Sequence, residues 1–360
     1  MDPLIQTISL NLGPRSYRIH VGDGLIDQAG RICSDLGLRG HAALVSDRNV
    51  EALYGDRTST ALQEAGFKVS NHLVDPGEPS KSFDSARGLC EDFARYGVNR
   101  QSFVVALGGG VIGDLAGFVA SIYYRGIPLV QIPTTVMAQV DSSIGGKTAV
   151  NLSAGKNLVG TFHQPIAVLA DTKTLETLGK REWNEGLAEV IKYGVIWERA
   201  LLAQLRAGSW KLQELVWRCA AIKASFVEKD EKDLTGSRAL LNFGHTLGHG
   251  IEAVARTLLH GEAVALGMVA AAHLSAKRAG LPQDDVEELI NTIKQFDLPT
   301  ALPRQLSRSD ILKKVFADKK FADGQIRFVV TSRLGEARVA HDLTVADLEF
   351  GLRSIESQGP

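Results

Sequence analysis

Short apolar runs alternate with helical patterns in the first half of the chain. From about residue 42, strand-like runs such as AALVS, VSNHLV, SFVVAL and PLVQIP are separated by segments such as EALYGDRTSTALQEAGF and FDSARGLCEDFARYG, which have helical patterns. This alternation predicts a parallel sheet with helices on its faces, a Rossmann-like α/β arrangement. The last clear strand of the series is AVLAD, which ends at Asp171.

The pattern changes near residue 175 to helices with little between them. These segments include WNEGLAEVIKYGVI, LQELVWRCAAIKASFVEKDEK and AVALGMVAAAHLSAKRAG, and only IRFVVTS and EARVAHDL near the end read as strands. A chain of 360 residues is also too long for one ordinary core. We therefore predict an α/β domain over residues 1–175 and a mainly α-helical domain over residues 176–360.

Composition and charge narrow the class of protein. The chain has 40 basic and 41 acidic residues, a balance that argues against nucleic acid or an acidic membrane as the main partner. Cys33, Cys90 and Cys219 form no CxxC pair and are typical of free thiols in a reducing cytosol. The opening MDPLIQTISLNLG has no long apolar core, and no apolar run is long enough to span a bilayer. We expect a cytoplasmic enzyme.

The segment SFVVALGGGVIGD places a glycine-rich turn between a predicted strand and a predicted helix. Gly108, Gly110 and Gly113 satisfy the GxGxxG pattern, in which glycines allow a sharp turn and the close approach of a pyrophosphate to the positive end of the helix. The alternative is a turn that only packs the helix on the strand. The strand and helix on either side favour nucleotide binding.

The acid that commonly holds the ribose about 20 residues after such a turn is absent, because that region reads PLVQIPTT. A nucleotide would therefore have to be held differently. Asp47 follows the run AALVS, and Glu78 and Lys81 lie in the loop DPGEPSK. All three are candidates because ligands bind at the carboxyl ends of strands in open α/β sheets, although each could also be an ordinary solvated residue.

The segment PTTVMAQVDSSIGGKTAVNLSAGKNLVGTFHQP shows neither helical nor strand periodicity. It predicts a long loop, and loops of this length in compact domains are usually functional. Lysines beside glycines indicate contacts with anions, whereas the alternative is a mobile surface loop. The polar candidates in this segment are Thr134, Thr135, Asp141, Lys147, Lys156, Asn157 and His163.

The segment NFGHTLGHGIEAVARTLLHGE contains the three histidines His245, His249 and His260. On a helix the first two project from one face, one turn apart, and the third can fold back toward them. Upstream, GLAEVIKYG adds Glu189 with Lys192 on the same helical face. Such residues could bind a metal and leave coordination positions open for a substrate, although an HxxxH pair also occurs on ordinary helix surfaces.

Several of these motifs together resemble the 3-dehydroquinate synthase family, in one order from about residue 47 to about residue 330. The motifs are GGGVIGD, PTTVMAQVDSSIGGKT, GKNLVGTFHQP, GLAEVIKYG, RALLNFGHTLGH, LHGEAVALGM and DKKFADGQIRFV. The resemblance implies a homodimeric enzyme with an active site in the cleft between an NAD-binding domain and a helical domain. It also implies conversion of a small sugar phosphate, 3-deoxy-D-arabino-heptulosonate 7-phosphate, into 3-dehydroquinate and phosphate.

The resemblance further assigns cofactor residues. A divalent metal, zinc or cobalt, would lie on Glu189, His245 and His260, and His249 would move a proton. NAD would be contacted by Asp47, Glu78, Lys81, Gly110, Val111, Ile112, Gly113, Asp114, Thr134, Thr135, Lys147, Lys156, Thr174, Leu175, Glu176 and Thr177.

Substrate residues follow from the same resemblance. Besides His249, the catalytic set would comprise Asp141, Lys147, Lys192, Arg238 and Asn242. Further substrate contacts would come from Asn157, from Lys156, which could serve either ligand, from one of Lys319 and Lys320, and from Arg125, which would reach the phosphate site of the neighbouring subunit.

Three alternatives remain at this level. A related sugar phosphate cyclase would use sedoheptulose 7-phosphate or glucose 6-phosphate, which lack a carboxylate, and Arg238 and Asn242 argue against it. A metal-dependent alcohol dehydrogenase of the glycerol dehydrogenase type would release NADH and need fewer anion-binding residues. A non-catalytic NAD or metal sensor would be expected to lack Lys147, His249 or a metal ligand, and the chain keeps them all.

Overall fold

The computed structural model describes residues 5–255, 257–317 and 327–357. The chain forms two compact units. Unit 1 consists of Met1–Leu178 with Leu212–Lys232, and unit 2 consists of Gly179–Lys211 with Asp233–Pro360. The ranges differ from the predicted 1–175 and 176–360 mainly in one helical segment, which returns to the first unit.

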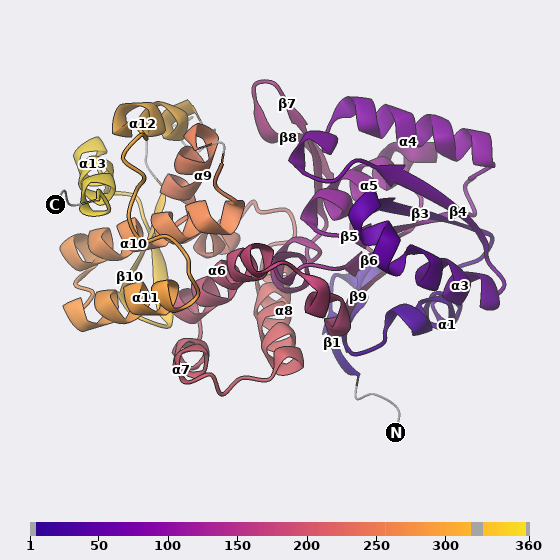
Figure 1. Ribbon diagram of the computed structural model, residues 1–360, viewed down its shortest axis with the longest axis horizontal. Coiled ribbons are helices and arrows are strands. Elements are labelled where there is room, and N and C mark those ends of the chain that lie inside the picture. Colours follow the sequence, from indigo (N-terminus) through magenta and orange to yellow (C-terminus); the bar gives the residue numbers. More distant parts are fainter. Residues whose placement is uncertain (1–4, 256, 318–326, 358–360) are drawn as a thin grey trace. The chain divides into compact units, whose positions relative to one another are not determined.

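Unit 1 is built on a seven-stranded sheet in the order β1-β2-β9-β6-β5-β3-β4 (Figure 1). All neighbouring strands are parallel except the pair β1 and β2. The strands are β1 (Gln6–Leu10), β2 (Tyr17–Gly22), β3 (His41–Asp47), β4 (Lys68–Val74), β5 (Phe103–Gly108), β6 (Leu129–Pro133) and β9 (Ala167–Asp171). The predicted parallel sheet is confirmed.

The central strands are apolar throughout because both faces of the sheet are covered. On β3, Ala42 and Leu44 belong to one core cluster, and Ala43 and Val45 belong to the other. The first cluster includes residues of α1 (Ala29–Asp35) and α3 (Asp56–Glu64), and the second includes residues of α4 (Phe83–Tyr96) and α5 (Gly110–Ile122). The short helix α2 (Arg48–Val50) follows β3.

The segment between Pro133 and Ala167 is not a long loop, so that prediction was wrong. It contains a single π-helical turn, η6 (Ala138–Ser142), followed by the antiparallel hairpin of β7 (Lys147–Leu152) and β8 (Gly155–Phe162). Most residues of β8 are exposed or half-buried. Without a fully buried face, this strand lacks the apolar alternation by which half-buried strands are recognised.

The helix α8 (Leu212–Lys229) belongs to unit 1, although the sequence pattern grouped it with the second half of the chain. It packs against β1, β2 and η6. At its C-terminal end, Glu228 accepts hydrogen bonds from the backbone and side chain of Asn11. The spacing of apolar residues predicted the helix, but it does not show which strands or helices cover its apolar face.

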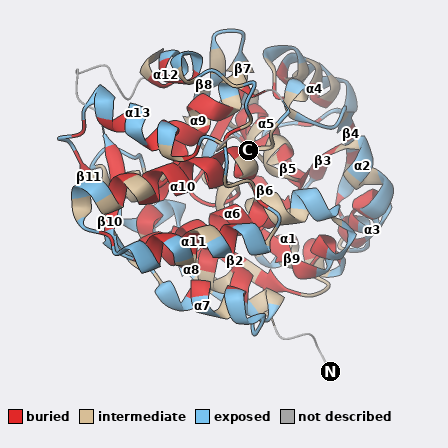
Figure 2. Ribbon diagram, turned by 60° about the vertical axis from the view of Figure 1, so that its left-hand side comes forward, coloured by how far each residue is buried: buried red, intermediate tan, exposed pale blue. Residues whose placement is uncertain are grey.

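Unit 2 is mainly helical, with one antiparallel strand pair. Its central helix α10 (His260–Ala279) is buried along most of its length (Figure 2). The other helices are α6 (Lys180–Ile196), α7 (Arg199–Ala207), α9 (His245–Val254), α11 (Gln283–Gln295), α12 (Arg308–Ala317) and α13 (Val345–Ser354), and the strands are β10 (Phe328–Arg333) and β11 (Glu336–Ala340). Within the described ranges, no helix is long and apolar enough to cross a membrane.

Candidate active site

Most of the residues predicted to bind NAD follow neighbouring parallel strands of unit 1. Asp47 ends β3, the glycine-rich turn follows β5, and Thr134 and Thr135 follow β6. The 3₁₀ segment η7 (Thr172–Thr177), which contains the predicted NAD residues Thr174 to Thr177, follows β9. Because β3, β5, β6 and β9 are adjacent and parallel, these segments lie along one edge of the sheet.

The glycine-rich turn leaves the start of α5 accessible to an anion. The N-cap residue Gly109 makes no side-chain cap, and the first turn of α5 contains no acidic residue. A Cβ atom on Gly109 would lie 3.0 Å from the side chain of Thr135. An uncapped helix start carries partial positive charge and free backbone N–H groups, which suit a phosphate.

Four predicted cofactor residues form two charged pairs near this turn. The ammonium of Lys81, which is buried, pairs with the carboxylate of Asp114. Burial raises the pKa of Asp114, even though Lys81 opposes the shift. Glu78 Oε1 accepts a hydrogen bond from Asn151 Nδ2 at 2.7 Å and lies 3.8 Å from Lys156 Nζ.

Asn151 is a residue of this site that the sequence did not reveal. Its backbone N–H donates to the carbonyl of Lys81 at 2.8 Å, and its side-chain oxygen accepts from the backbone N–H of Asn157 at 2.9 Å. Asn157 has a φ of 57°, in the left-handed region. Asn151 therefore joins the Glu78–Lys81 segment to the hairpin that carries Asn157, and recognition of that hairpin was the missing signal.

Two further contacts of unit 1 were also missed. The buried side chain of Gln139 donates to the carbonyls of Pro133 and Asp171, so it joins the segments that follow β6 and β9. Lys223 on α8 pairs with the predicted substrate residue Asp141 at 2.9 Å.

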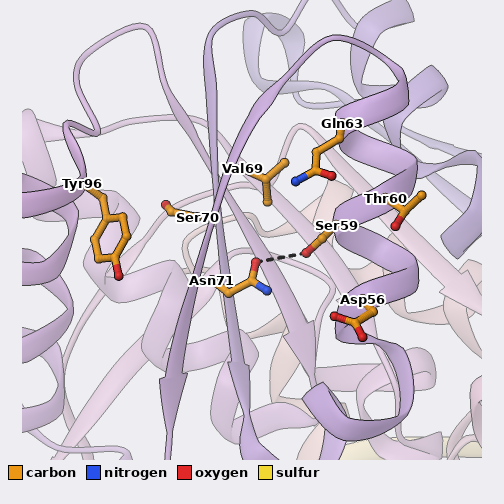
Figure 3. Close-up of a pocket in the computed structure, with 8 residues that line it drawn as sticks. All are labelled: Asp56, Ser59, Thr60, Gln63, Val69, Ser70, Asn71 and Tyr96. Carbon is orange, nitrogen blue, oxygen red and sulfur yellow. Dashed lines mark hydrogen bonds between the residues drawn. The ribbon is translucent and has the colours of Figure 1, made fainter.

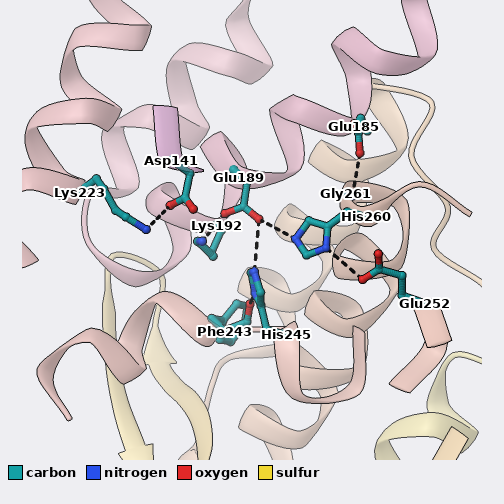
Figure 4. Close-up of polar contacts among 10 residues, drawn as sticks. All are labelled: Asp141, Glu185, Glu189, Lys192, Lys223, Phe243, His245, Glu252, His260 and Gly261. Carbon is teal, nitrogen blue, oxygen red and sulfur yellow. Dashed lines mark hydrogen bonds and ion pairs between the residues drawn. The ribbon is translucent and has the colours of Figure 1, made fainter. Parts of the chain in front are cut away.

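The predicted metal ligands meet within unit 2 (Figure 4). Glu189 Oε1 on α6 lies 3.4 Å from Nε2 of His245, the first residue of α9, and 3.8 Å from Nε2 of His260, the first residue of α10. The same Oε1 atom is buried and has no hydrogen-bond partner. A buried carboxylate oxygen costs free energy unless it is satisfied, and a divalent cation held with the two imidazoles would satisfy it. The residues therefore fit a metal.

His249 lies beside these ligands. Its ring centroid is 5.3 Å from that of His245 and 5.8 Å from that of His260, and the three imidazoles offer ring nitrogens within 4.8 Å of one another. A set of three histidines is therefore also compatible with the geometry. The buried Oε1 atom favours Glu189 as the third ligand and leaves His249 one helical turn from His245.

The charges around Glu189 keep it ionised, as a metal ligand must be. Burial alone would raise its pKa, but Lys192, His245 and His260 together hold the pKa well below the usual value. Lys192 is itself buried and pairs with Glu189 Oε2. Burial lowers the pKa of His245, which favours the neutral imidazole that binds metals.

Two glycines allow the helices to approach closely enough for this cluster. A Cβ atom on Gly267 of α10 would lie 2.0 Å from the carbonyl oxygen of Gly244, the residue before His245. A Cβ atom on Gly261 would lie 2.0 Å from the carbonyl oxygen of Glu185 on α6. Both positions therefore require glycine, and they bring the helices that carry the three predicted ligands into close contact.

The remaining predicted residues are spread over both units. Arg238, which is buried, and Asn242 lie in the 3₁₀ segment η8 (Ser237–Asn242) of unit 2. Lys147 begins β7 and is exposed, and Arg125 lies exposed in η5 (Tyr123–Arg125), both in unit 1. Two predicted substrate residues, Lys319 and Lys320, lie outside the described residues.

A surface hollow of about 630 Å³ lies elsewhere in unit 1, between α3 and the edge strand β4 (Figure 3). Its lining is mostly polar, and Ser59 Oγ donates to Asn71 Oδ1 across it at 3.0 Å. The lining residues are Asp56, Ser59, Thr60, Gln63, Val69, Ser70, Asn71 and Tyr96, which include none of the predicted site residues.

Comparison with known proteins identifies the family of this chain. The models of the N-terminal and C-terminal parts of 3-dehydroquinate synthase match residues 71–185 and 186–321. The 3-dehydroquinate synthase of Desulforamulus reducens (strain ATCC BAA-1160 / DSM 100696 / MI-1) is 46% identical over 352 residues, which cover 95% of this chain and 98% of that protein.

Solved structures share the fold. The 2-epi-5-epi-valiolone synthase ValA of Streptomyces hygroscopicus subsp. jinggangensis 5008, with NAD⁺ and Zn²⁺ bound, has a TM-score of 0.86 at 27% identity, over 94% of this chain and 96% of that chain. A 2-deoxy-scyllo-inosose synthase complexed with carbaglucose-6-phosphate, NAD⁺ and Co²⁺ has a TM-score of 0.86 at 24% identity, over 97% and 99% of the two chains.

The parallel sheet and the helical unit have the same fold as these two sugar phosphate cyclases. Within that class, this chain belongs to the 3-dehydroquinate synthase family. The resemblance predicted from the motifs is confirmed.

Proposed function

We propose that this protein is a carbon–oxygen lyase that converts 3-deoxy-D-arabino-heptulosonate 7-phosphate into 3-dehydroquinate and phosphate. The observation that carries the proposal is the cluster of Glu189, His245 and His260, in which a buried carboxylate oxygen without a hydrogen bond lies beside two imidazole nitrogens. Membership of the family supports the same reaction.

Both cofactors have fitting residues. When bound, NAD would take a hydride from C5 of the substrate and later return it, and zinc or cobalt would act as a Lewis acid on the adjacent C4 and C5 hydroxyls. Glu189, His245 and His260 would hold the metal. The start of α5, with Lys81 and Glu78 beside it, would hold the nucleotide.

The protein's own side chains would manage protons and anions. His249 would accept the proton of the C5 hydroxyl, since a neutral imidazole can act as a general base and this ring lies beside the ligand cluster. Lys147, Lys192 and Arg238 would neutralise the carboxylate and phosphate of the substrate, with arginine able to bind two oxygens at once. Asp141 would bind a substrate hydroxyl, and Asn242 would bind the carboxylate together with Arg238.

The residues of unit 1 would serve mainly the nucleotide, and those of unit 2 the metal and the substrate's carboxylate. The proposed activity therefore depends on both units. A carboxylate-binding role of Arg238 and Asn242 also distinguishes the proposed substrate from sedoheptulose 7-phosphate and glucose 6-phosphate, which have no carboxylate.

Phosphate release tests this function. Purified protein would be incubated with 3-deoxy-D-arabino-heptulosonate 7-phosphate, NAD and zinc, with and without a chelator, while phosphate and NADH are followed together. We expect chelator-sensitive phosphate release without net accumulation of NADH, because the hydride is returned in each turnover. Parallel reactions with sedoheptulose 7-phosphate and glucose 6-phosphate would test the related cyclases.

Two outcomes would contradict the proposal. An absence of phosphate release from the proposed substrate would exclude the reaction. Stoichiometric accumulation of NADH would instead indicate a dehydrogenase. The predicted homodimer and cytoplasmic location stay predictions.

A further inference from the structure

The two histidines of the metal cluster differ in what holds their second ring nitrogen. His245 Nδ1 donates to the backbone carbonyl of Phe243 at 3.2 Å. His260 Nδ1 lies 3.1 Å from Oε2 of Glu252, a carboxylate on α9 (Figure 4). Both contacts direct the other ring nitrogen, Nε2, toward Glu189. The partner of Nδ1 fixes the tautomer and the orientation of an imidazole, so these contacts decide how each ring presents itself to a metal.

His260 depends more than His245 on a hydrogen-bond partner at Nδ1 to hold its ring in place. The side chain of His245 is 10% exposed, whereas that of His260 is 31% exposed, although both begin a helix. Packing alone therefore restrains the first ring more than the second. The side chain of Glu252 is only 12% exposed. Its contact with His260 therefore differs from the solvent-exposed ion pairs of protein surfaces, which contribute little.

We propose that Glu252 is a positioning residue that orients His260 for the metal. The carboxylate accepts the Nδ1 proton of His260, which leaves Nε2 as the nitrogen facing Glu189, and its charge makes that nitrogen a better metal ligand. The proposal rests on the proposed function only in assuming that the cluster binds a divalent metal. Glu252 is expected to touch neither substrate nor metal.

A neighbouring acid provides a matched control. Glu185 Oε2 accepts a hydrogen bond from the backbone N–H of Gly261 at 3.0 Å, and this acid also lies close enough to act on the charge of His260. It supports the first turn of α10 rather than the imidazole. Glu185→Gln removes a negative charge near the cluster but keeps an oxygen that can accept from Gly261.

The experiment measures zinc affinity of metal-free protein in competition with a chromogenic chelator, for the parent, Glu252→Ala, Glu252→Gln and Glu185→Gln. We expect Glu252→Ala to bind zinc about 10–100-fold more weakly than the parent, the usual effect of losing a partner of a metal-bound histidine. Glu252→Gln keeps an acceptor without the charge and should lose less. Glu185→Gln should stay close to the parent.

A second readout separates positioning from general damage to the fold. Thermal unfolding of each metal-free variant should resemble that of the parent, while the visible absorption of the Co²⁺-loaded Glu252→Ala protein should change, because the ligand field depends on how His260 is oriented. Parent-like zinc affinity in Glu252→Ala would overturn the proposal. Equal losses in Glu252→Ala and Glu185→Gln would overturn it as well, since nearby negative charge alone would then explain the effect.

The metal measurements need no substrate, so they remain independent of catalysis. If the parent binds zinc but releases no phosphate, the proposed function fails while the role of Glu252 can still be judged from the affinities. If the parent releases phosphate and Glu252→Ala binds zinc normally, only the role of Glu252 fails.

Discussion

At the scale of single residues, the histidines of the cluster have separable roles. His260→Ala should remove metal and activity together, because it deletes a ligand. His249→Ala should keep the metal and slow turnover by about 10²–10⁴-fold, the usual contribution of a general base. Zinc content by atomic emission and the rate of phosphate release would be measured on the same preparations.

A second histidine of α10 serves as the control for His260 and His249. His273 is half-buried and lies outside the cluster, so His273→Ala should keep both metal and rate. Retention of zinc in His260→Ala would refute its assignment as a ligand. Loss of zinc in His249→Ala would show that all three imidazoles bind the metal.

The buried His72 predicts how stability depends on pH. It lies on β4 with Nε2 at 2.7 Å from Ser70 Oγ, and burial lowers its pKa to about 4. In the unfolded chain the pKa of this histidine is about 6.5. Between pH 6.5 and 4 the unfolded chain therefore binds the proton more readily than the folded protein does. The contribution of His72 to the free energy of unfolding is thus complete above pH 6.5 and falls as the pH drops toward 4. The fall should amount to about 3 kcal/mol in the free energy of unfolding.

Chemical denaturation at several pH values between 7.5 and 4.5 would measure this effect. In His72→Gln, which has no titrating group at this position, the decline in stability with falling pH should be shallower than in the parent. The comparison uses the slope with pH, so a constant loss of stability caused by the substitution does not affect it. Equal slopes would rule out His72 as the source.

At the scale of helices and strands, the close approach of α9 and α10 should be sensitive to a single methyl group. Gly267→Ala would place a Cβ atom 2.0 Å from the carbonyl oxygen of Gly244, so the helices must separate. We expect a loss of about 1–3 kcal/mol in stability, typical of overpacking, together with weaker zinc binding, because His245 and His260 are carried by the two displaced helices. Calorimetry and zinc competition would measure both.

Gly88→Ala serves as the control for Gly267→Ala, because it adds the same methyl group to a helix. Gly88 lies inside α4, and a Cβ atom there would meet nothing within 4 Å. Alanine should therefore be neutral or stabilising by up to about 1 kcal/mol, as expected from helix propensity. A similar loss in both variants would argue that the approach of α9 and α10 is not the cause.

The same elements explain which parts of the fold could be predicted from the sequence. Strands β3, β5 and β6 are covered on both faces, so they appear as continuous apolar runs. The exposed strand β8 carries no such pattern, and the β7–β8 hairpin was therefore missed. The periodicity of α8 revealed a helix but not that it packs on β1 and β2.

The candidate site shows the same limit. The histidines and Glu189 could be predicted as site residues because they lie in recognisable motifs. Asn151, Glu252 and Lys223 could not, because their roles arise from contacts with residues that the fold brings near. A sequence motif can name a ligand, whereas the residues that orient it are found only once the elements are assembled.

At the scale of the whole molecule, the remaining question is whether one active site uses residues of two subunits. Arg125 is exposed and follows Tyr124 in η5, and both have positive φ angles, 69° and 51°. Two adjacent non-glycine residues in this region are strained, and such strain is commonly kept for function. The family resemblance assigns Arg125 to the phosphate site of a neighbouring subunit. Arg125 is exposed and follows the C-terminal end of α5, whereas the glycine-rich turn precedes the N-terminal end of that helix, and this position is compatible with the role.

Mixed dimers would show whether Arg125 acts in the active site of its own subunit or in that of the neighbouring subunit. Arg125→Ala and His249→Ala subunits with different affinity tags would be co-expressed, and the heterodimer would be purified through both tags. If Arg125 acts across the interface, one site of each heterodimer has both residues intact, and the activity should be about half that of the parent because one of two sites works. If Arg125 acts within its own subunit, each site lacks one residue and the heterodimer stays as inactive as the single variants. A monomer in solution would exclude the shared site altogether, since no second subunit would then be present to supply the arginine.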